Sequence, residues 1–257
     1  MKGRLSSIRD AIDRVIVITI ESATDRQKAV TRRLDDAGIS FEFHFGRDAR
    51  SASIDQLIAE GEYDAVTRRA SGRPDLTPAE IGCAISHRDV ARKIASGADQ
   101  RVLILEDDLR VIEENVSGFD AAMAAIPPDW DLAYFGYSPM NLFTPWQIRL
   151  KLLSYYPIRY LLGSDRHNPR TIARIYRRPL SELWMRAGWF NDAHAYALNR
   201  DAAAAIARSQ SPISVEADIA LNHLVKFSRL NAICLENPIF AQDRSMPSLI
   251  GARPSWK

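Results

Sequence analysis

Cysteine is scarce in this 257-residue chain, and its scarcity excludes two kinds of protein. Only Cys83 and Cys234 occur, each within an apolar stretch, so we interpret both as buried free thiols. Two such cysteines give neither a disulfide framework nor a cysteine-based metal site. This composition fits a reducing compartment.

Long apolar runs and a strong net charge are also lacking. No stretch approaches the ~20 apolar residues that span a bilayer, and the first apolar run, residues 15–20, is too short for the core of a secretory signal. The net charge of +2 gives the whole molecule no strong attraction to nucleic acid. We therefore expect a cytoplasmic protein, and attachment to the inner face of the cytoplasmic membrane stays open.

The order of apolar patterns predicts an α/β fold. The hydrophobic and charged fractions, 46% and 26%, are ordinary for a folded protein, and the length suits one domain over residues 1–257. Strands and helices are expected to alternate along the chain. We expect strands at 15–20, 41–45, 101–105, 131–136, 193–198 and 231–235, and helices at 25–37, 77–96, 116–126, 201–208 and 215–227. Thr24 is expected to cap the first of these helices and Gly38 to end it, and Thr77, Pro78 and Glu80 form a capping pattern at the start of the second. Residues 46–76 are expected to form a loop with a short helix.

Residues 138–186 differ in composition from the rest of the chain. Nine lysines and arginines are interleaved with tryptophans and tyrosines, and only Asp165 and Glu182 oppose them, for a local charge of +7. We interpret the segment as an insertion on the α/β scaffold. It either lies on an anionic membrane surface or packs on the domain with its aromatic residues in the core. Nucleic-acid binding does not fit, because no matching motif accompanies the basic residues.

Three acidic residues follow one predicted strand directly. The apolar residues 101–105 lead into Glu106, Asp107 and Asp108, and ligands of open α/β sheets bind outside the carboxyl ends of strands. Three neighbouring carboxylates repel one another unless a cation lies among them, and such oxygen-rich groups suit Mg²⁺ or Mn²⁺. A solvated turn is the alternative. A nucleotidyl transferase, a phosphodiesterase or a sugar transferase would each use a site of this kind.

Two sequence blocks resemble one known family. Residues 80–87 read E-I-G-C-x-x-S-H, and residues 103–108 read L-I-L-E-D-D. This pair is similar to glycosyltransferase family 25, the lipooligosaccharide galactosyltransferase type. Weaker blocks agree in order at residues 15–26, 193–206, 212–218 and 237–248. The resemblance covers residues 15–136 and 189–250, and leaves the basic segment unmatched.

The resemblance implies a GT-A-type, Rossmann-like fold, with a mixed central sheet flanked by helices. It also implies a nucleotide-sugar donor, most often UDP-galactose, a divalent metal at the acidic turn, and inversion at the anomeric carbon. We expect Asp108 to be the metal ligand, with Glu106 as a second ligand. Asp107 or Glu106 would bind the ribose or reach the metal through water. Further donor-binding candidates are Thr19, Arg26, Ser86, His87 and Gln242.

Each candidate has a structural alternative. Arg26 would grip a phosphate or the uracil with its guanidinium, or form a surface ion pair. A lone histidine such as His87 is more often structural than catalytic. The base that deprotonates the acceptor hydroxyl must lie across the sugar from the diphosphate. Asp218 is our first candidate and Asp192 our second, although both would also suit a helix cap.

The sequence thus predicts an inverting hexosyltransferase that uses a UDP-sugar. Its acceptor would be a lipid-linked or free glycan such as lipopolysaccharide or lipooligosaccharide. One alternative is a metal-dependent nucleotidyl transferase or phosphodiesterase. The other is a non-catalytic membrane-surface binding module on the same fold.

Overall fold

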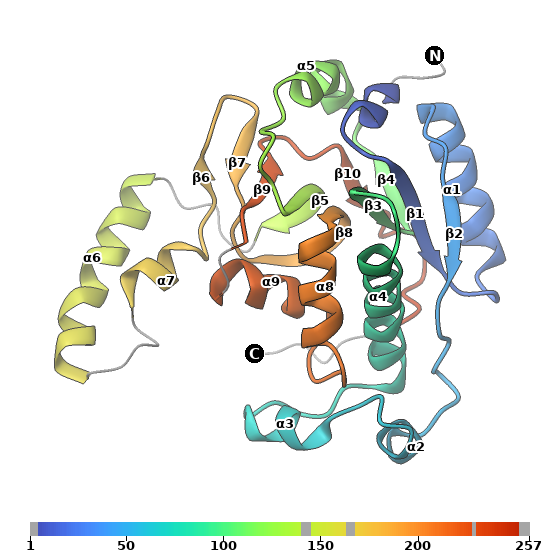
Figure 1. Ribbon diagram of the computed structural model, residues 1–257, viewed down its shortest axis with the longest axis horizontal. Helices are drawn as coiled ribbons and strands as arrows, with labels where there is room; N and C mark the ends of the chain where they lie inside the picture. The colour runs from blue at the N-terminus through green and yellow to red at the C-terminus, as the bar shows by residue number, and fades with distance from the viewer. Residues whose placement is uncertain (1–4, 140–144, 163–167, 228–229, 252–257) are drawn as a thin grey trace.

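A mixed eight-stranded sheet lies at the centre of the molecule (Figure 1). The computed structural model describes residues 5–139, 145–162, 168–227 and 230–251. The strand order is β2-β1-β3-β8-β5-β9-β7-β6, and β4 and β10 form a separate pair. The strands are β1 (Arg14–Thr19), β2 (Glu42–Phe45), β3 (Arg101–Glu106), β4 (Leu109–Val111), β5 (Leu132–Pro139), β6 (Arg178–Pro179), β7 (Trp184–Arg186), β8 (Phe190–Asn199), β9 (Ala232–Leu235) and β10 (Phe240–Gln242).

Helices cover both faces of this sheet, as an α/β fold requires. The α-helices are α1 (Thr24–Ala37), α2 (Ile54–Ala59), α3 (Ala65–Ala70), α4 (Pro78–Ser96), α5 (Phe119–Ala124), α6 (Pro145–Leu162), α7 (Pro169–Ala173), α8 (Arg200–Ser209) and α9 (Ala217–Phe227). Two 3₁₀ helices, η1 (Ser6–Asp10) and η2 (Glu113–Gly118), complete the described elements. The predicted fold class, a mixed sheet flanked by helices, is confirmed.

The direction of the strands places three chain segments at one edge. β1 pairs in parallel with both β2 and β3, so their carboxyl ends point the same way. β8 lies antiparallel between β3 and β5, which makes the sheet mixed. The segments after β1, β2 and β3 therefore meet at the edge where α/β proteins bind ligands.

Alternation along the strands produces two cores. Val17 and Leu105 belong to the core beneath α1 and α5. Their neighbours Ile16 and Ile104 belong to the core beneath α4, α8 and α9. Strands buried on both faces read as continuous apolar runs, which explains the pattern at residues 15–20 and 101–105.

The predicted ends of two helices had different outcomes. α4 begins as predicted, because the Thr77 side chain accepts from the Glu80 N–H at 3.2 Å and the Glu80 carboxylate accepts from the Thr77 N–H at 2.8 Å. Gly38 ends α1 with a left-handed φ of 76°. The prediction that Thr24 caps α1 was wrong. Thr24 is the first helical residue, and the preceding Ala23 offers no side-chain oxygen.

The basic segment divides into two parts. β7 pairs with β9 and carries β6 as the outermost strand of the sheet. Trp184 is fully buried in the main core, and its indole N–H donates to the Ala122 carbonyl at 2.8 Å. α6 and α7 instead pack on each other through a small cluster that includes Ile148 and Ile172, to one side of the sheet (Figure 1). Residues 178–186 thus extend the sheet, whereas α6 packs on α7, which in turn contacts α9.

Several short elements differ from the sequence prediction. Residues 46–76 contain two helices, α2 and α3, instead of one. The predicted helix at 116–126 is η2 followed by α5, and the strand pair β4–β10 was not predicted. Short elements lack the repeated periodicity on which such predictions depend. Within the described ranges, no helix has the length and apolar character needed to cross a membrane.

Candidate active site

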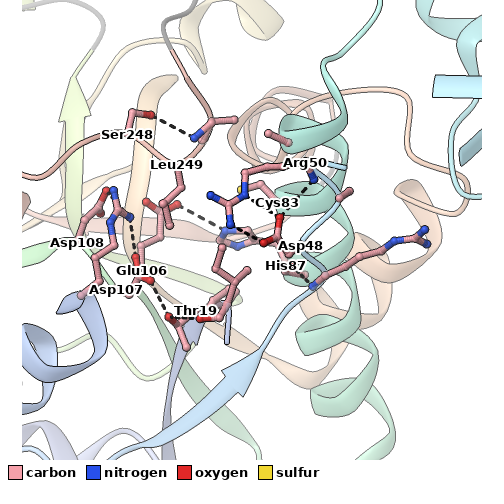
Figure 2. A pocket seen from close by; sticks show the side chains of 18 of the residues that line it. Thr19, Asp48, Arg50, Cys83, His87, Glu106, Asp107, Asp108, Ser248 and Leu249 are labelled. Atoms are coloured by element: carbon pink, nitrogen blue, oxygen red, sulfur yellow. Dashed lines mark hydrogen bonds and ion pairs between the residues drawn. The ribbon is translucent and has the colours of Figure 1, made fainter. Parts of the chain in front are cut away.

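A cavity opens at the carboxyl ends of β1, β2 and β3 (Figure 2). It encloses about 730 Å³ of empty space and adjoins a second cavity of about 1250 Å³, both partly open to solvent. The second cavity contains both predicted bases, Asp192 and Asp218. Glu106, Asp108 and Gln242 line both cavities, so the acidic turn lies where the two meet. The predicted residues that line the first cavity are Thr19, Arg26, Ser86, His87, Glu106, Asp107, Asp108 and Gln242.

Asp107 is fully engaged by the protein. Its Oδ2 accepts from the Thr19 hydroxyl at 2.7 Å, and its Oδ1 accepts from Arg26 Nη1 at 2.8 Å (Figure 2). Charge-assisted bonds of this kind are strong when they are buried, and Thr19 is only 3% exposed. Asp107 therefore anchors the turn to β1 and α1, which gives Thr19 a positioning task.

Arg26 brings a positive charge to the acidic turn from within the chain. Besides Asp107, its Nη1 lies 3.4 Å from Asp108 Oδ2, and its Nη2 donates to the Pro247 carbonyl at 2.6 Å. The cation expected among these carboxylates is thus supplied in part by the chain itself. The guanidinium links the turn to the C-terminal segment, and two of its three nitrogens are engaged within the protein.

Asp108 differs from its neighbour because one of its carboxylate oxygens has no hydrogen-bond partner in the described part of the chain. Its Oδ2 accepts from Gln242 Nε2 at 3.0 Å, whereas Oδ1 is buried without a hydrogen bond among the described residues. Burial and the nearby charge of Glu106 raise the pKa of Asp108 to about 6. A buried, unsatisfied carboxylate oxygen is costly, so this oxygen is the atom of the turn that is best suited to a ligand.

Glu106 belongs to a chain of polar groups that runs into the sheet. Its Oε1 lies 3.5 Å from His87 Nε2, and His87 Nδ1 lies 2.7 Å from the Tyr196 hydroxyl. Burial alone would lower the pKa of His87, but Tyr196, the Cys83 thiol and Glu106 together raise it well above its usual value. His87 in turn lowers the pKa of Glu106, against the effect of burial. His87 therefore lies between Tyr196 and Glu106 and orients the Glu106 carboxylate.

The chemistry of these donors fits a divalent cation only in part. No group of three or more histidine, cysteine, aspartate or glutamate side chains gathers closely enough in the described ranges to hold an ion. A Mg²⁺-type site, however, commonly uses one or two carboxylates and completes its shell with substrate phosphates and water. Asp108, through its unpartnered oxygen, and Glu106 would provide those carboxylates.

The second cavity is bordered by a buried ion pair. Arg68, 3% exposed, donates from Nη1 and Nη2 to the two carboxylate oxygens of Glu216 at 2.8 and 3.0 Å. Glu216 lies just before α9, whose first turn carries Asp218. This fork-like contact fixes the start of α9. Asp218 is thereby positioned in the cavity wall, and Asp192 of β8 lies in the same wall.

The loop after β2 contributes residues that the sequence analysis missed. Arg47, Asp48 and Arg50 line the first cavity. Arg50 Nε donates to Asp48 Oδ1 at 2.8 Å, and hydrogen bonds from Arg50 lower the pKa of Asp48 to about 2. The available signal was topological, because two strands joined by a crossover helix usually run parallel and end at the same edge of a sheet.

Ser86 serves the packing of this loop. Its hydroxyl donates to the Gly82 carbonyl at 2.7 Å and accepts from the Arg47 N–H at 3.1 Å. A Cβ at Gly46 would lie 2.1 Å from that hydroxyl oxygen. Ser86 therefore acts on the cavity mainly by positioning the loop after β2. Gly46 allows this loop to approach Ser86 closely.

The C-terminal segment forms the remaining wall. β10 pairs with β4, and the Asp243 N–H donates to the Asp108 carbonyl at 2.6 Å. Asp243 also forms an ion pair with Arg33 of α1. The predicted donor residue Gln242 thus reaches the site through a strand pair that closes behind the acidic turn. Three further residues of this segment line the first cavity, namely Ser248, Leu249 and Ile250.

The sequence of this chain matches that of a family of sugar-transferring enzymes. The model of glycosyltransferase family 25, described as an LPS biosynthesis protein, matches residues 12–221. The chain therefore belongs to glycosyltransferase family 25. The resemblance predicted from residues 80–87 and 103–108 is confirmed.

Individual relatives are distant. A glycosyltransferase 25 family member of Aedes aegypti is 28% identical over 137 residues, which cover 49% of this chain and 21% of the mosquito protein. Procollagen galactosyltransferase 1 of Danio rerio is 28% identical over 138 residues, covering 52% of this chain and 23% of that protein. The chain thus matches about a fifth of the length of these curated relatives. A solved glycosyltransferase involved in glycosylating the major capsid of PBCV-1 has a TM-score of 0.41 and 8% identity, covering 91% of this chain and 93% of that one.

Proposed function

We propose that this protein is an inverting glycosyltransferase that moves a hexose, galactose in the first instance, from a UDP-sugar to a hydroxyl of a glycan acceptor. Membership of the family supports the reaction class, and the name of the zebrafish relative supports galactose. The observation that carries the proposal is the position of the unpartnered Asp108 oxygen at the junction of two cavities. A reacting centre between a donor and an acceptor needs such a junction.

The first cavity would take the nucleotide sugar. Arg47 and Arg50 line it beside Asp48, and guanidinium groups suit phosphates and polar base edges. Glu106 and Asp108 would hold a divalent ion, Mn²⁺ or Mg²⁺, which neutralises the diphosphate when it is bound. The protein itself fixes the turn through Arg26 and Thr19.

The second cavity would take the acceptor. In the proposed reaction, the acceptor oxygen forms a bond to the anomeric carbon as the bond to the diphosphate oxygen breaks. The acceptor proton passes to a carboxylate, and Asp218 is our first candidate for this base, ahead of Asp192. Both lie in the second cavity, with the acidic turn between them and the first.

The proposed acceptor is a lipid-linked glycan such as lipopolysaccharide or lipooligosaccharide, met at the inner face of the cytoplasmic membrane. α6 supports this proposal, because Trp146, Leu150 and Leu153 are 61, 58 and 61% exposed. Their spacing of four and three residues puts them on one helix face, away from the packed Ile148. An apolar stripe beside basic residues such as Arg149 suits an anionic lipid surface.

Donor titration tests the proposal directly. UDP-galactose, UDP-glucose and UDP-N-acetylglucosamine would be compared with and without Mn²⁺, following the melting temperature and the release of UDP. A ligand that binds only the folded state raises the melting temperature as its concentration exceeds its dissociation constant. We expect metal-dependent stabilisation that Asp108→Asn abolishes. Absence of any response to the three donors would contradict the UDP-sugar proposal.

The products distinguish the rival enzyme class. A transferase of sugar releases UDP, whereas a nucleotidyl transferase or phosphodiesterase on the same turn releases UMP or pyrophosphate. A membrane-binding module without catalysis would release none of them while still binding vesicles. Analysis of both the nucleotide and the pyrophosphate products, combined with vesicle binding, therefore separates all three.

A further inference from the structure

A third cavity, which shares no lining residue with the two at the acidic turn, is lined by three arginines. Arg174 follows α7, Arg178 is in β6 and Arg186 is in β7. The cavity encloses about 1260 Å³ of empty space, part of it open to solvent. None of its described lining residues is acidic. The others are Ala173, Ala187, Val225, Leu230, Asn231 and Ala232.

Two of these arginines face each other directly. Arg178 and Arg186 are register partners of the antiparallel pair β6–β7. Directly opposed residues of such a pair project from the same face, and like charges there are destabilising. No ion pair to Arg178 or Arg186 occurs among the described residues. The strand pair therefore brings together two charges that repel each other.

The surroundings of Arg178 show the same imbalance. Arg178 is exposed at the rim of the cavity, and its pKa is lowered by loss of solvent around the guanidinium first and then by the charges of Arg186 and Arg174. Every one of these effects disfavours the charged form, yet a guanidinium stays protonated. An anion between the arginines would remove the repulsion and offer hydrogen-bond acceptors to Arg178.

Arg186 is held in place for such a ligand. Its Nη1 donates to Asn231 Oδ1 at 3.0 Å. Asn231 is fixed in turn, because its backbone N–H donates to Asp131 Oδ2 at 2.7 Å. A guanidinium carries five N–H groups, so the side chain can stay oriented by one of them while others bind a ligand. Preorganisation of this kind lowers the entropy cost of binding.

We propose that Arg174, Arg178 and Arg186 form a binding site for a phosphate group, distinct from the donor cavity. Several guanidinium groups around one tetrahedral anion match its three or more acceptor oxygens better than a carboxylate with two. The site also assigns a task to the arginines of the basic segment that follow α6, which the proposed transfer reaction does not use. Arg174 follows α7, on which α6 packs. Because α6 is the helix that we propose to contact the membrane, the phosphate belongs either to a lipid headgroup or to a phosphorylated small molecule.

The test compares the full-length protein with Arg178→Gln/Arg186→Gln and with Arg208→Gln. Arg208 is an exposed arginine of α8 outside the cavity, and its replacement controls for the loss of a surface arginine elsewhere. Melting temperatures would be measured in sodium phosphate and in sodium chloride of equal ionic strength. We expect the melting temperatures of the wild type and of Arg208→Gln to be higher in phosphate than in chloride. The phosphate concentration that gives half of this increase should be at least tenfold higher for the double variant.

A second measurement separates the two sources of phosphate. Sedimentation with phosphatidylglycerol vesicles, against phosphatidylcholine vesicles, would be compared for the same three proteins. A tenfold loss of vesicle binding in the double variant assigns the site to a lipid headgroup. If the double variant loses only the stabilisation by inorganic phosphate and binds vesicles as the wild type does, the site is assigned to a soluble ligand. Equal behaviour of all three proteins in both measurements would overturn the proposal.

Two controls keep the result interpretable. In low-salt chloride the double variant should melt no lower than the wild type, because it loses the repulsion between Arg178 and Arg186. Its stabilisation by UDP-galactose should also be unchanged, since the donor cavity is separate. A double variant that is folded and binds the donor but ignores phosphate would therefore support the site, whatever the fate of the proposed transfer reaction.

Discussion

Charges of one sign cluster at two places in this molecule, and the two clusters differ in the partners that the rest of the chain supplies. At the acidic turn, Asp107 receives Arg26 and Thr19, and Glu106 receives His87. At the cavity beside β6 and β7, arginines face one another and no described lining residue is acidic. In the first cluster the chain supplies a cationic or imidazole partner to each of Asp107 and Glu106, whereas no ion pair to Arg178 or Arg186 occurs in the described part of the second.

This difference shows how a cluster of charges can be assigned to structure or to ligand binding. Asp107 and Asp108 are adjacent in sequence, but of the two only Asp108 keeps a buried oxygen without a partner among the described residues. Both residues are aspartates, each with a single carboxylate. What separates them is whether the fold brings a counter-charge to each, and the predictions below test that distinction.

Asp108→Asn should have the largest effect on activity. We expect UDP-sugar turnover to fall by about 10³-fold or more, equivalent to about 4 kcal/mol of transition-state stabilisation, with the fold intact. Asp107→Asn is the matched control, because it should lower the melting temperature by leaving Arg26 without its main partner. Steady-state kinetics and thermal melts of the two variants measure this. If the two variants lost the same activity and had the same melting temperature, the proposed distinction between Asp107 and Asp108 would be wrong.

Asp218→Asn tests the assignment of the second cavity. We expect the turnover number to fall about 10²–10³-fold, since a positioned base contributes that much, while the affinity for UDP-sugar stays unchanged. Asp192→Asn should cost about tenfold or less if Asp218 is the base. Kinetics with a soluble acceptor, combined with donor titration, provide both numbers. The reverse ranking of the two variants would transfer the role to Asp192.

Arg68→Met should show how far the second cavity depends on an internal counter-charge. Breaking a buried pair by removing one partner costs about 3–5 kcal/mol of stability, measured by urea denaturation. Methionine keeps much of the apolar volume of the side chain without its charge, so the variant removes the ion pair with little change in packing. Arg69→Met is the matched control, because the Arg69 pair with Asp75 is largely exposed and should matter far less. Equal losses in the two variants would contradict the role of burial.

The same pair predicts a dependence on pH. Burial would raise the pKa of Glu216, but the hydrogen bonds and charge of Arg68 lower it below its usual value. A lowered carboxylate pKa stabilises the fold above the unfolded-state value, about 4.3, and this contribution is lost as pH falls through the folded-state pKa. The difference in stability between wild type and Arg68→Met should therefore shrink below about pH 4. A constant difference down to about pH 3 would be inconsistent with this linkage.

Trp146→Ser with Leu150→Ser should have the smallest effect, and only on membrane binding. Loss of two apolar side chains that would enter the lipid surface should weaken binding to phosphatidylglycerol vesicles by about tenfold. Val66→Ser is the control, because Val66 is 79% exposed on α3, away from α6. Vesicle sedimentation measures both. Unchanged binding in the α6 variant would remove the support that α6 gives to a lipid-linked acceptor.

Much of the fold followed from local patterns. Continuous apolar runs predicted β1 and β3, and the capping pattern at Thr77 and Glu80 predicted the start of α4, because both depend on neighbouring residues alone. The short strands β4 and β10 were missed, since each is defined by a partner that is distant along the chain. Trp184 was interpreted within an insertion, although its burial depends on the pairing of β7 with β9.

Motifs and periodicities written along the chain were enough to predict the family, the α/β class and an acidic turn at the end of a strand. They could not predict which carboxylate keeps an open oxygen, that Arg26 compensates Asp107, or that Arg178 faces Arg186. Those features came from the folded arrangement alone. The physical reason is that a charge is tuned by its neighbours in space, and strand pairing, not sequence distance, selects those neighbours.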